Sequence, residues 1–158
     1  MSQTRDITLT INGETIRANV PVRQNLADFL RNGQGLTGTH VGCEHGVCGA
    51  CTLLMDDQTV RSCLTLAVQA DGATITTIEG FGARADAEAL RAAFTARNAL
   101  QCGYCTPGML ASALEYIEAG GGADRAAIRE HLSGNYCRCT GYQSIVDAIC
   151  DTIEGRHS

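Results

Sequence analysis

The chain has 158 residues, which is enough for one ordinary domain or for two small ones. Its formal net charge is −5 at pH 7 and like charges form no long run, so the basic surface that nucleic-acid binding requires is missing. No apolar stretch reaches the length of a membrane span, and the N-terminus lacks the basic and apolar regions of a signal peptide, so we expect a cytoplasmic protein with no membrane span.

The first predicted element is a β-hairpin. Apolar and polar residues alternate over 6–11, and Asn-Gly at 12–13 provides a turn that often joins two short antiparallel strands. We expect the returning strand over 15–20. A short helix is predicted over 25–31, with Asn25 as its N-cap.

A glycine-rich stretch with four cysteines follows, and it is the most informative part of the sequence. From Gly42 to Cys63 it reads GCEHGVCGACTLLMDDQTVRSC, with the spacing C-x4-C-x2-C-x11-C that is typical of a plant-type [2Fe–2S] site. The four cysteines are Cys43, Cys48, Cys51 and Cys63. We expect Gly42, Gly46 and Gly49 to supply positive φ angles, which would turn backbone N–H groups towards the sulfur atoms.

Three further strands complete the first half of the chain. The pattern predicts a second hairpin from 52–55 and 59–63, which would return Cys63 to the cysteine loop at the end of a strand. Residues 74–78 alternate again. Residues 1–79 should therefore form a small α+β domain that consists of a sheet, one helix and a metal-holding loop.

The glycine-rich segment 80–85 is predicted to be a linker, because the apolar residues beyond it repeat with the period of a helix. Thr106-Pro107 is a typical helix start. The expected helices cover 86–97, with Asp86 as a cap, 106–119, 123–132 and a last segment that starts at Thr140-Gly141. Residues 86–158 should therefore form a second, four-helix domain.

A second set of four cysteines has the pattern C-x2-C-x31-C-x-C. Its members are Cys102, Cys105, Cys137 and Cys139. Each pair precedes a predicted helix, and free N–H groups at a helix N-terminus stabilise thiolates. Two such helices that lie side by side and start at the same end would bring four thiolates together, which indicates a second metal site.

Disulfide bonds and zinc are the alternatives to iron–sulfur ligation. The nine cysteines could form a disulfide framework, but nothing indicates secretion, and an odd number leaves one thiol over. Zinc is the main rival at the second set, although structural zinc usually takes C-x2-C pairs on both sides. At the first set, the C-x4-C-x2-C spacing favours iron.

The other potential metal ligands have simpler interpretations. His40 and His45 flank the first cysteine, but four cysteines already complete that set, so we expect solvent-facing or interface residues and not Rieske-type ligands. His131 and His157 are expected on the surface. Cys150 falls on the inward face of the last helix and should pack as a small apolar residue.

With both cysteine sets in view, the chain resembles the small iron–sulfur subunit of molybdenum hydroxylases, the family of xanthine dehydrogenase, aldehyde oxidoreductase and carbon monoxide dehydrogenase. The resemblance covers nearly the whole chain. Its motifs are GCEHGVCGACT (42–52), RSC ending at Cys63, QCGYCTPGM (101–109) and NYCRCTGY (135–142). Tyr104 stands at a position where an aromatic residue, often phenylalanine, is usual in this family.

The resemblance implies an α+β fold with an N-terminal ferredoxin-like β-grasp domain and a C-terminal four-helix bundle domain, each with one [2Fe–2S] cluster. It implies that the distal cluster is held by Cys43, Cys48, Cys51 and Cys63, and the proximal cluster by Cys102, Cys105, Cys137 and Cys139. It also implies that Gln101 and Cys139 approach a molybdopterin.

The implied function is that of a redox subunit with no catalytic residue of its own. A large partner subunit would bind the molybdopterin and oxidise the substrate, and electrons would pass through the proximal and distal clusters to FAD in a medium subunit. The complex would be a heterotrimer or a dimer of heterotrimers. The alternatives are a stand-alone ferredoxin-like electron carrier and a zinc-stabilised interaction module. The substrate and the final acceptor are not encoded in this chain.

Overall fold

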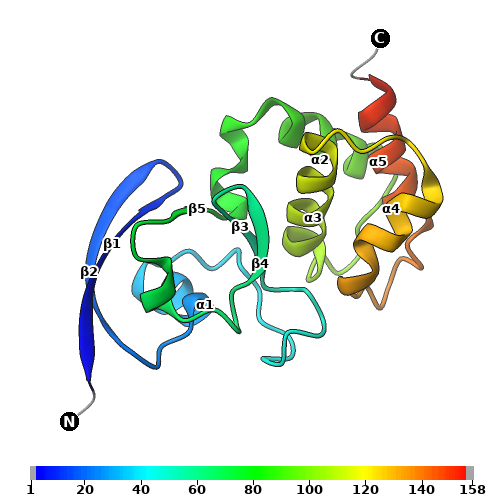
Figure 1. The fold of residues 1–158 in the computed structure, drawn as a ribbon. Helices are drawn as coiled ribbons and strands as arrows, with labels where there is room; N and C mark the ends of the chain where they lie inside the picture. The colour runs from blue at the N-terminus through cyan, green and yellow to red at the C-terminus, as the bar shows by residue number, and fades with distance from the viewer. Residues whose placement is uncertain (1–2, 156–158) are drawn as a thin grey trace.

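A mixed β-sheet occupies one end of the molecule and helices occupy the other in the computed structural model, which describes residues 3–155 (Figure 1). The strands are β1 (Thr4–Ile11), β2 (Glu14–Pro21), β3 (Thr52–Met55), β4 (Gln58–Arg61) and β5 (Thr74–Thr76). The α-helices are α1 (Leu26–Asp28), α2 (Ala85–Ala96), α3 (Thr106–Glu118), α4 (Arg125–His131) and α5 (Gln143–Gly155). A π-helical turn spans Phe29–Gly33, and 3₁₀ helices span Ala67–Ala70, Ile78–Ala83 and Leu132–Gly134.

The five strands lie in the order β2-β1-β5-β3-β4. The first hairpin is confirmed: β1 and β2 pair antiparallel from Thr4 opposite Pro21 to Ile11 opposite Glu14. β1 pairs parallel with β5, and β5 and β4 both pair antiparallel with β3. The result agrees with the predicted α+β class, with a ferredoxin-type sheet followed by helices. We call 4–76 the sheet region and 78–155 the helical region.

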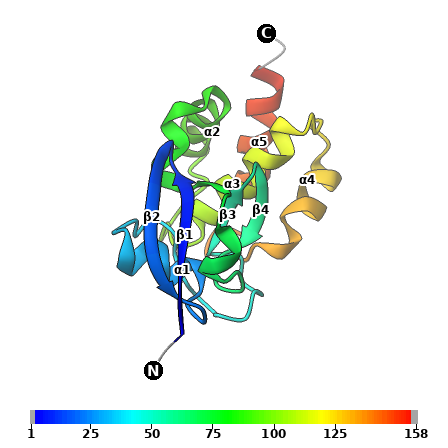
Figure 2. The same ribbon diagram turned by 60° about the vertical axis from the view of Figure 1, so that its left-hand side comes forward.

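The predicted helix at 25–31 is only partly α-helical. Asn25 is its N-cap as expected, since its side chain accepts a hydrogen bond from the Asp28 N–H at 2.7 Å. The α-helix then widens into one π turn from Phe29 onwards. Phe29 and Leu30, which are adjacent in sequence, are both buried in the core of the sheet region together with residues of β1 and β2. Figure 2 shows α1 beside these two strands.

The segment between the two regions is packed against the helices. The predicted linker at 80–85 overlaps the 3₁₀ helix Ile78–Ala83, and Phe81 in that helix is only 1% exposed. α2 then begins at Ala85, and its N-cap is Arg84 and not the predicted Asp86. Phe81 is buried among helical-region residues, and α2 starts four residues after it. No flexible spacer is therefore observed at 80–85.

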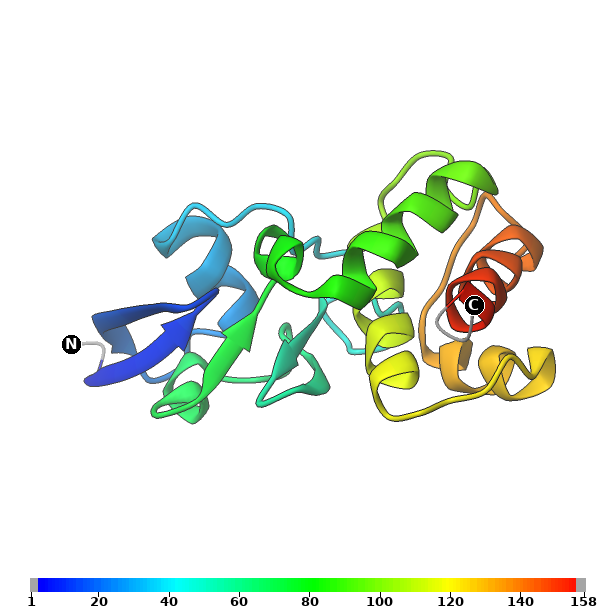
Figure 3. The ribbon, with the colours of Figure 1, turned by 90° about the horizontal axis from the view of Figure 1, so that it is seen from above.

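The helical region packs around α3, which lies next to the sheet region (Figure 3). Five apolar residues of α3 that lie at helical spacing are buried, namely Met109, Leu110, Ala113, Leu114 and Ile117. α4 begins after Asp124, whose carboxylate accepts hydrogen bonds from the first-turn N–H groups of Ala126 and Ala127. Cys150 is 5% exposed within the same core, as predicted.

Strand β3 contributes to both hydrophobic cores. Successive side chains of a strand point to opposite faces. Leu53 therefore belongs to the core of the sheet region, whereas Leu54 packs in the core of the helical region. The exposed fractions of the two side chains are 1% and 0%. This strand thus joins the two regions through direct apolar packing.

Candidate metal centres

The first cysteine set lies in the loop that precedes β3 and in the turn that follows β4. β4 ends at Arg61, so Cys63 lies just beyond the strand and not at its last residue as predicted. Gly46 and Gly49 have the expected positive φ angles of 74° and 75°. Gly42 does not; its lack of a side chain instead leaves room for Cys48, since a Cβ there would lie 3.1 Å from that sulfur.

Backbone N–H groups point at the sulfur of Cys43. The His45 N–H and the Cys48 N–H donate to Cys43 Sγ at 3.3 Å and 3.4 Å. The bond from Cys48 is the main cause that lowers the pKa of Cys43 to about 6, with the bond from His45 second. The thiolate is the form that ligates metals, so this loop prepares Cys43 for ligation.

The four thiols of the first set lie as two pairs. The Cys43 thiol neighbours that of Cys48, and the Cys51 thiol neighbours that of Cys63. The pairs are close enough for Cys43 to interact electrostatically with Cys63. Burial, followed by the neighbouring Cys51 thiol, raises the pKa of Cys63 to about 11. The structure therefore brings together all four cysteines that the spacing selected.

The second set also lies as two pairs. The sulfur atoms of Cys102 and Cys139 are 3.5 Å apart, and the Cys105 thiol neighbours that of Cys137. Burial and the Cys137 thiol raise the pKa of Cys105 to about 12. Burial also opposes ionisation of Cys137, but hydrogen bonds from the Thr140 hydroxyl and N–H outweigh it and lower the pKa.

The predicted placement of the second set at helix N-termini is correct for one pair only. Cys105 is the N-cap residue of α3, and Cys102 lies in the loop just before it. α5 begins at Gln143, so Cys137 and Cys139 lie in the preceding loop, where they are held by the Thr140 contacts. The alternative of a disulfide framework is not supported, since all nine cysteines are free thiols.

Pairs of thiols fit a [2Fe–2S] cluster better than a single ion. Two irons bridged by sulfide take two thiolates each, whereas structural zinc takes four ligands around one point. The donor set and its arrangement in pairs therefore suit a binuclear cluster at each site.

The two sites differ in exposure. Cys51 of the first set is 2% exposed, whereas Cys102 and Cys139 of the second set are exposed in the isolated chain. Gln101 lies on the same exposed edge and donates a hydrogen bond from Nε2 to the Cys139 carbonyl oxygen at 3.1 Å. The structure therefore brings together Gln101 and Cys139, the two residues singled out for molybdopterin proximity.

Tyr104, which lies between Cys102 and Cys105, contacts the segment just before Cys43, a role that the sequence did not suggest. Its hydroxyl donates to the Val41 carbonyl oxygen at 2.7 Å, and its ring stacks on His40 at a centroid distance of 4.7 Å. His40 Nδ1 also contacts the Tyr104 carbonyl oxygen at 2.8 Å. His40 thus lies at the contact between the first cysteine loop and the segment around Tyr104, and its Nδ1 is within hydrogen-bond distance of the Tyr104 carbonyl oxygen.

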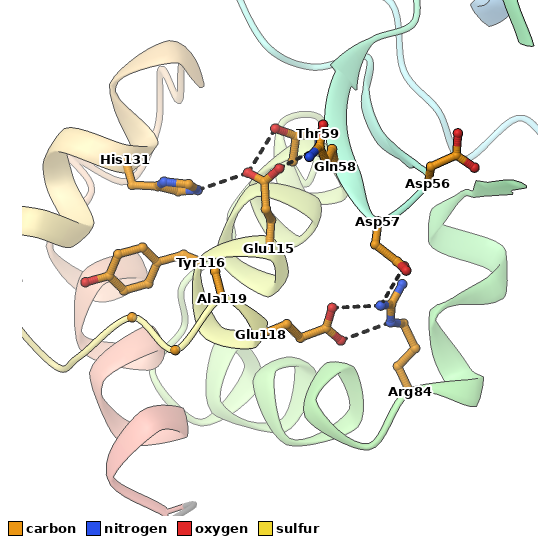
Figure 4. Close-up of a pocket in the computed structure, with 12 residues that line it drawn as sticks. Asp56, Asp57, Gln58, Thr59, Arg84, Glu115, Tyr116, Glu118, Ala119 and His131 are labelled. Carbon is orange, nitrogen blue, oxygen red and sulfur yellow. Dashed lines mark hydrogen bonds and ion pairs between the residues drawn. The ribbon is translucent and has the colours of Figure 1, made fainter. Parts of the chain in front are cut away.

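A wide pocket between the β3–β4 turn and the helical region is crossed by ion pairs and hydrogen bonds (Figure 4). Arg84 pairs with Asp57 at 2.9 Å and with Glu118 at 2.7 Å. Glu115 accepts hydrogen bonds from Thr59, and His131 lies 3.4 Å from the same carboxylate. His131 is exposed, as predicted, while the predicted surface position of His157 lies outside the described residues. These contacts tie the two regions together.

Known proteins with similar sequences and structures span nearly the whole chain. It is 53% identical over 146 residues to the nicotine 6-hydroxylase small subunit of Paenarthrobacter nicotinovorans, which covers 92% of this chain and 88% of that protein. It is 52% identical over 148 residues to caffeine dehydrogenase subunit gamma of Pseudomonas sp. strain CBB1, with coverages of 90% and 87%. The crystal structure of quinoline 2-oxidoreductase from Pseudomonas putida 86 matches with a TM-score of 0.91 and 49% identity, over 99% of this chain and 98% of that chain.

Two family models match consecutive parts of the chain. Residues 9–76 match the 2Fe-2S iron-sulfur cluster binding domain, and residues 77–150 match the [2Fe-2S] binding domain. A ferredoxin-type sheet followed by a helical region with its own cysteine set defines an iron–sulfur protein. Within that class, the chain belongs to the family of small iron–sulfur subunits of molybdenum hydroxylases. Among the described residues, no helix is both long and apolar enough to cross a bilayer.

Proposed function

We propose that the chain is an electron-transfer subunit with two [2Fe–2S] clusters. The distal cluster would be held by Cys43, Cys48, Cys51 and Cys63, and the proximal cluster by Cys102, Cys105, Cys137 and Cys139. The observation that carries this proposal is the arrangement of each set of four thiols as two adjacent pairs. When bound, such a cluster accepts and releases one electron at a time.

The residues around the sulfur atoms prepare both sites. The N–H groups of His45 and Cys48 donate to Cys43, and the Thr140 hydroxyl donates to Cys137 at 3.1 Å. Hydrogen bonds to sulfur stabilise the thiolate, and they also tune the reduction potential of a cluster. In this proposal the chain holds no catalytic residue, because it orients redox centres and makes no substrate bond.

We propose two partner subunits, a large one with molybdenum-molybdopterin and a medium one with FAD, in a heterotrimer or a dimer of heterotrimers. Relatives named as small, gamma and beta subunits support a multi-subunit assembly. Electrons would enter at the second cysteine set, where Gln101 and Cys139 form an exposed edge suited to face the molybdopterin. They would leave towards FAD from the first set.

The proposal divides the chain into a ferredoxin-like β-grasp domain at 1–79, a connecting segment at 80–85 and a four-helix bundle at 86–158. The two separate hydrophobic cores support this division, although Leu54 of the first part packs in the second core. We also propose a cytoplasmic location, since cluster assembly needs the eight thiols in their reduced form.

Replacement of one buried ligand tests the proposal. The full chain, purified with its partner subunits, should contain about four irons, as two [2Fe–2S] clusters require. Cys51→Ser should remove about half of that iron and one of two reduced-cluster signals in electron paramagnetic resonance, because the serine oxygen is a poorer ligand for iron. The helical region should remain folded, as measured by circular dichroism.

Cys150→Ala is the matched control, because Cys150 is also buried but packs in the apolar core. This variant should keep both signals and the full iron content. Two intact signals in Cys51→Ser would contradict the ligand assignment. A colourless wild-type protein that contains zinc in place of iron would overturn the proposed function itself.

A further inference from the structure

The loop that carries Cys43, Cys48 and Cys51 touches the loop that carries Cys137 and Cys139 directly through backbone atoms. The Tyr136 N–H, next to Cys137, donates to the Cys48 carbonyl oxygen at 2.8 Å. A Cβ added at Gly49 would lie 2.6 Å from the Gly134 carbonyl oxygen, which is closer than real Cβ atoms approach. Residues of the second loop therefore lie directly on residues of the first.

Asn135 lies at the centre of this contact and is only 3% exposed. Its Oδ1 accepts hydrogen bonds from Arg61 Nη2 at 3.3 Å and from Ser112 Oγ at 3.0 Å. Its Nδ2 donates to the Gly49 carbonyl oxygen at 3.2 Å and to Thr52 Oγ1 at 3.3 Å. These four bonds are the usual full capacity of a side-chain amide, with two accepted and two donated.

The partners also fix which way the amide points. Arg61 can only donate, so it must face the oxygen, and the Gly49 carbonyl can only accept, so it must face the nitrogen. Rotation of the amide by half a turn would leave the partly buried Arg61 guanidinium facing an N–H group. The Asn135 side chain therefore has one orientation in this site.

The partners of Asn135 lie close to the cysteines in sequence. Gly49 follows Cys48 directly, Thr52 follows Cys51 directly, and Asn135 itself precedes Cys137 by a single intervening residue. We propose that Asn135 is a positioning residue that fixes the second cysteine set relative to the first. It would hold the two cluster sites at one separation and one orientation.

Removal of this amide should loosen the contact. Asn135→Ala would remove the amide that donates to both the Gly49 carbonyl and the Thr52 hydroxyl in a buried site. None of the lost bonds involves a cysteine sulfur. Each set of four thiols should therefore still form, while the distance between the two sets should vary more.

The test uses the full chain in the complex with which it is purified, and it rests on the proposed function because it needs a cluster in each set. Iron content and the individual paramagnetic resonance signals report whether both clusters are present. The dipolar interaction between the two reduced clusters reports their separation, because it falls with the cube of the distance. Asn135→Ala should retain both signals but show a weaker and broader dipolar interaction than the wild type.

Asn19→Ala is the control for the same substitution elsewhere, since Asn19 is exposed and its side chain donates to the Asp6 carboxylate, far from both cysteine sets in sequence. It should leave the dipolar interaction unchanged. Ser112→Ala removes one of the four bonds and should produce a smaller change in the same direction as Asn135→Ala. Ser112→Ala replaces Asn135→Ala as the test variant if Asn135→Ala does not retain its clusters.

The two proposals fail in different ways. A wild-type complex without two reducible clusters would overturn the proposed function. Two clusters whose dipolar interaction is identical in the wild type and Asn135→Ala would overturn the positioning role alone. If Asn135→Ala holds no iron, an unchanged interaction in Ser112→Ala would overturn that role equally.

Discussion

Gly108 lies in the first turn of α3, at the point where this helix meets the first cysteine loop. A Cβ at this position would overlap the Gly49 carbonyl oxygen and lie 3.3 Å from that of Ala50. The absence of a side chain thus sets how closely α3 approaches the loop. The close approach of α3 to the loop that carries Cys48 and Cys51 depends on this glycine as well as on the hydrogen bonds of Asn135.

We predict that Gly108→Ala destabilises the protein. Alanine is favoured over glycine inside a helix by about 1 kcal/mol. The clash with backbone atoms that cannot move independently should outweigh this gain and lower the free energy of unfolding by about 1–3 kcal/mol. Denaturant unfolding measures the change. Gly155→Ala in α5, where an added Cβ has no neighbour within 4 Å, should cause no loss, and equal effects at both positions would contradict the clash.

The sequence predicts the function of a single residue where a motif spaces residues of one type in a recognisable pattern, as it does for the cysteines. The structure places the cysteines of each set near one another, and their roles as cluster ligands stay a prediction. Asn135 and Tyr104 also fall within the motifs that carried the family resemblance, but their roles could not be predicted. Their partners, Gly49 and Val41, lie in the other half of the chain, and only the folded structure brings them together.

The β3–β4 hairpin is held against α3 by a carboxylate. Glu115 Oε1 accepts from the Thr59 N–H at 2.6 Å, and its Oε2 accepts from the Thr59 hydroxyl at 3.0 Å. Figure 4 shows this carboxylate between the hairpin and His131. The Thr59 N–H belongs to the edge strand of the sheet, so Glu115 satisfies a backbone donor that would otherwise be left to solvent.

We predict that Glu115→Ala lowers the free energy of unfolding by about 1.5–3 kcal/mol, the usual range for hydrogen bonds to a charged group. The Glu115 side chain is 24% exposed, so solvent screening places the expected value at the lower end. Denaturant unfolding again measures the change. Glu88→Ala is the control, because the Glu88 side chain is 74% exposed and its pair with Arg91 spans 3.7 Å. If Glu115→Ala lowers the free energy of unfolding no more than Glu88→Ala does, the hydrogen bonds between Glu115 and Thr59 add no stability.

Elements defined by neighbouring residues were predicted well. The first hairpin follows from alternation on both sides of an Asn-Gly turn, and both of its strands agree with the structure. The π turn after α1 and the packing of Phe81 were not predicted. Each depends on which distant side chains cover the segment, and the local pattern carries no information about those side chains.

At the scale of the whole molecule, β3 lies between the two cores. Leu53 and Leu54 are adjacent, both buried and chemically identical, yet each packs in a different core. The same substitution at these two neighbouring positions would disturb one core at a time. The pair therefore allows a test of how the stability of one region depends on the other.

We predict that Leu54→Ala reduces the hydrogen-exchange protection of α3 as well as that of the strands. The lost side chain should cost about 2–5 kcal/mol, which is typical for a large-to-small change in a core. Leu53→Ala should cost a similar amount but act mainly on the strands and α1. Mass spectrometry of exchanged peptides distinguishes the two patterns. Identical patterns for both variants would contradict a separate role for each face of β3.

The two faces of β3 have a consequence for protein engineering. The boundary between the two family matches, at residues 76 and 77, looks like a natural place to separate an exchangeable module. A fragment cut there would turn the fully buried Leu54 towards water and leave the Thr59 N–H without its carboxylate. A graft of either half into another protein would therefore need a substitute for α3 or for β3. The transferable unit is the whole chain.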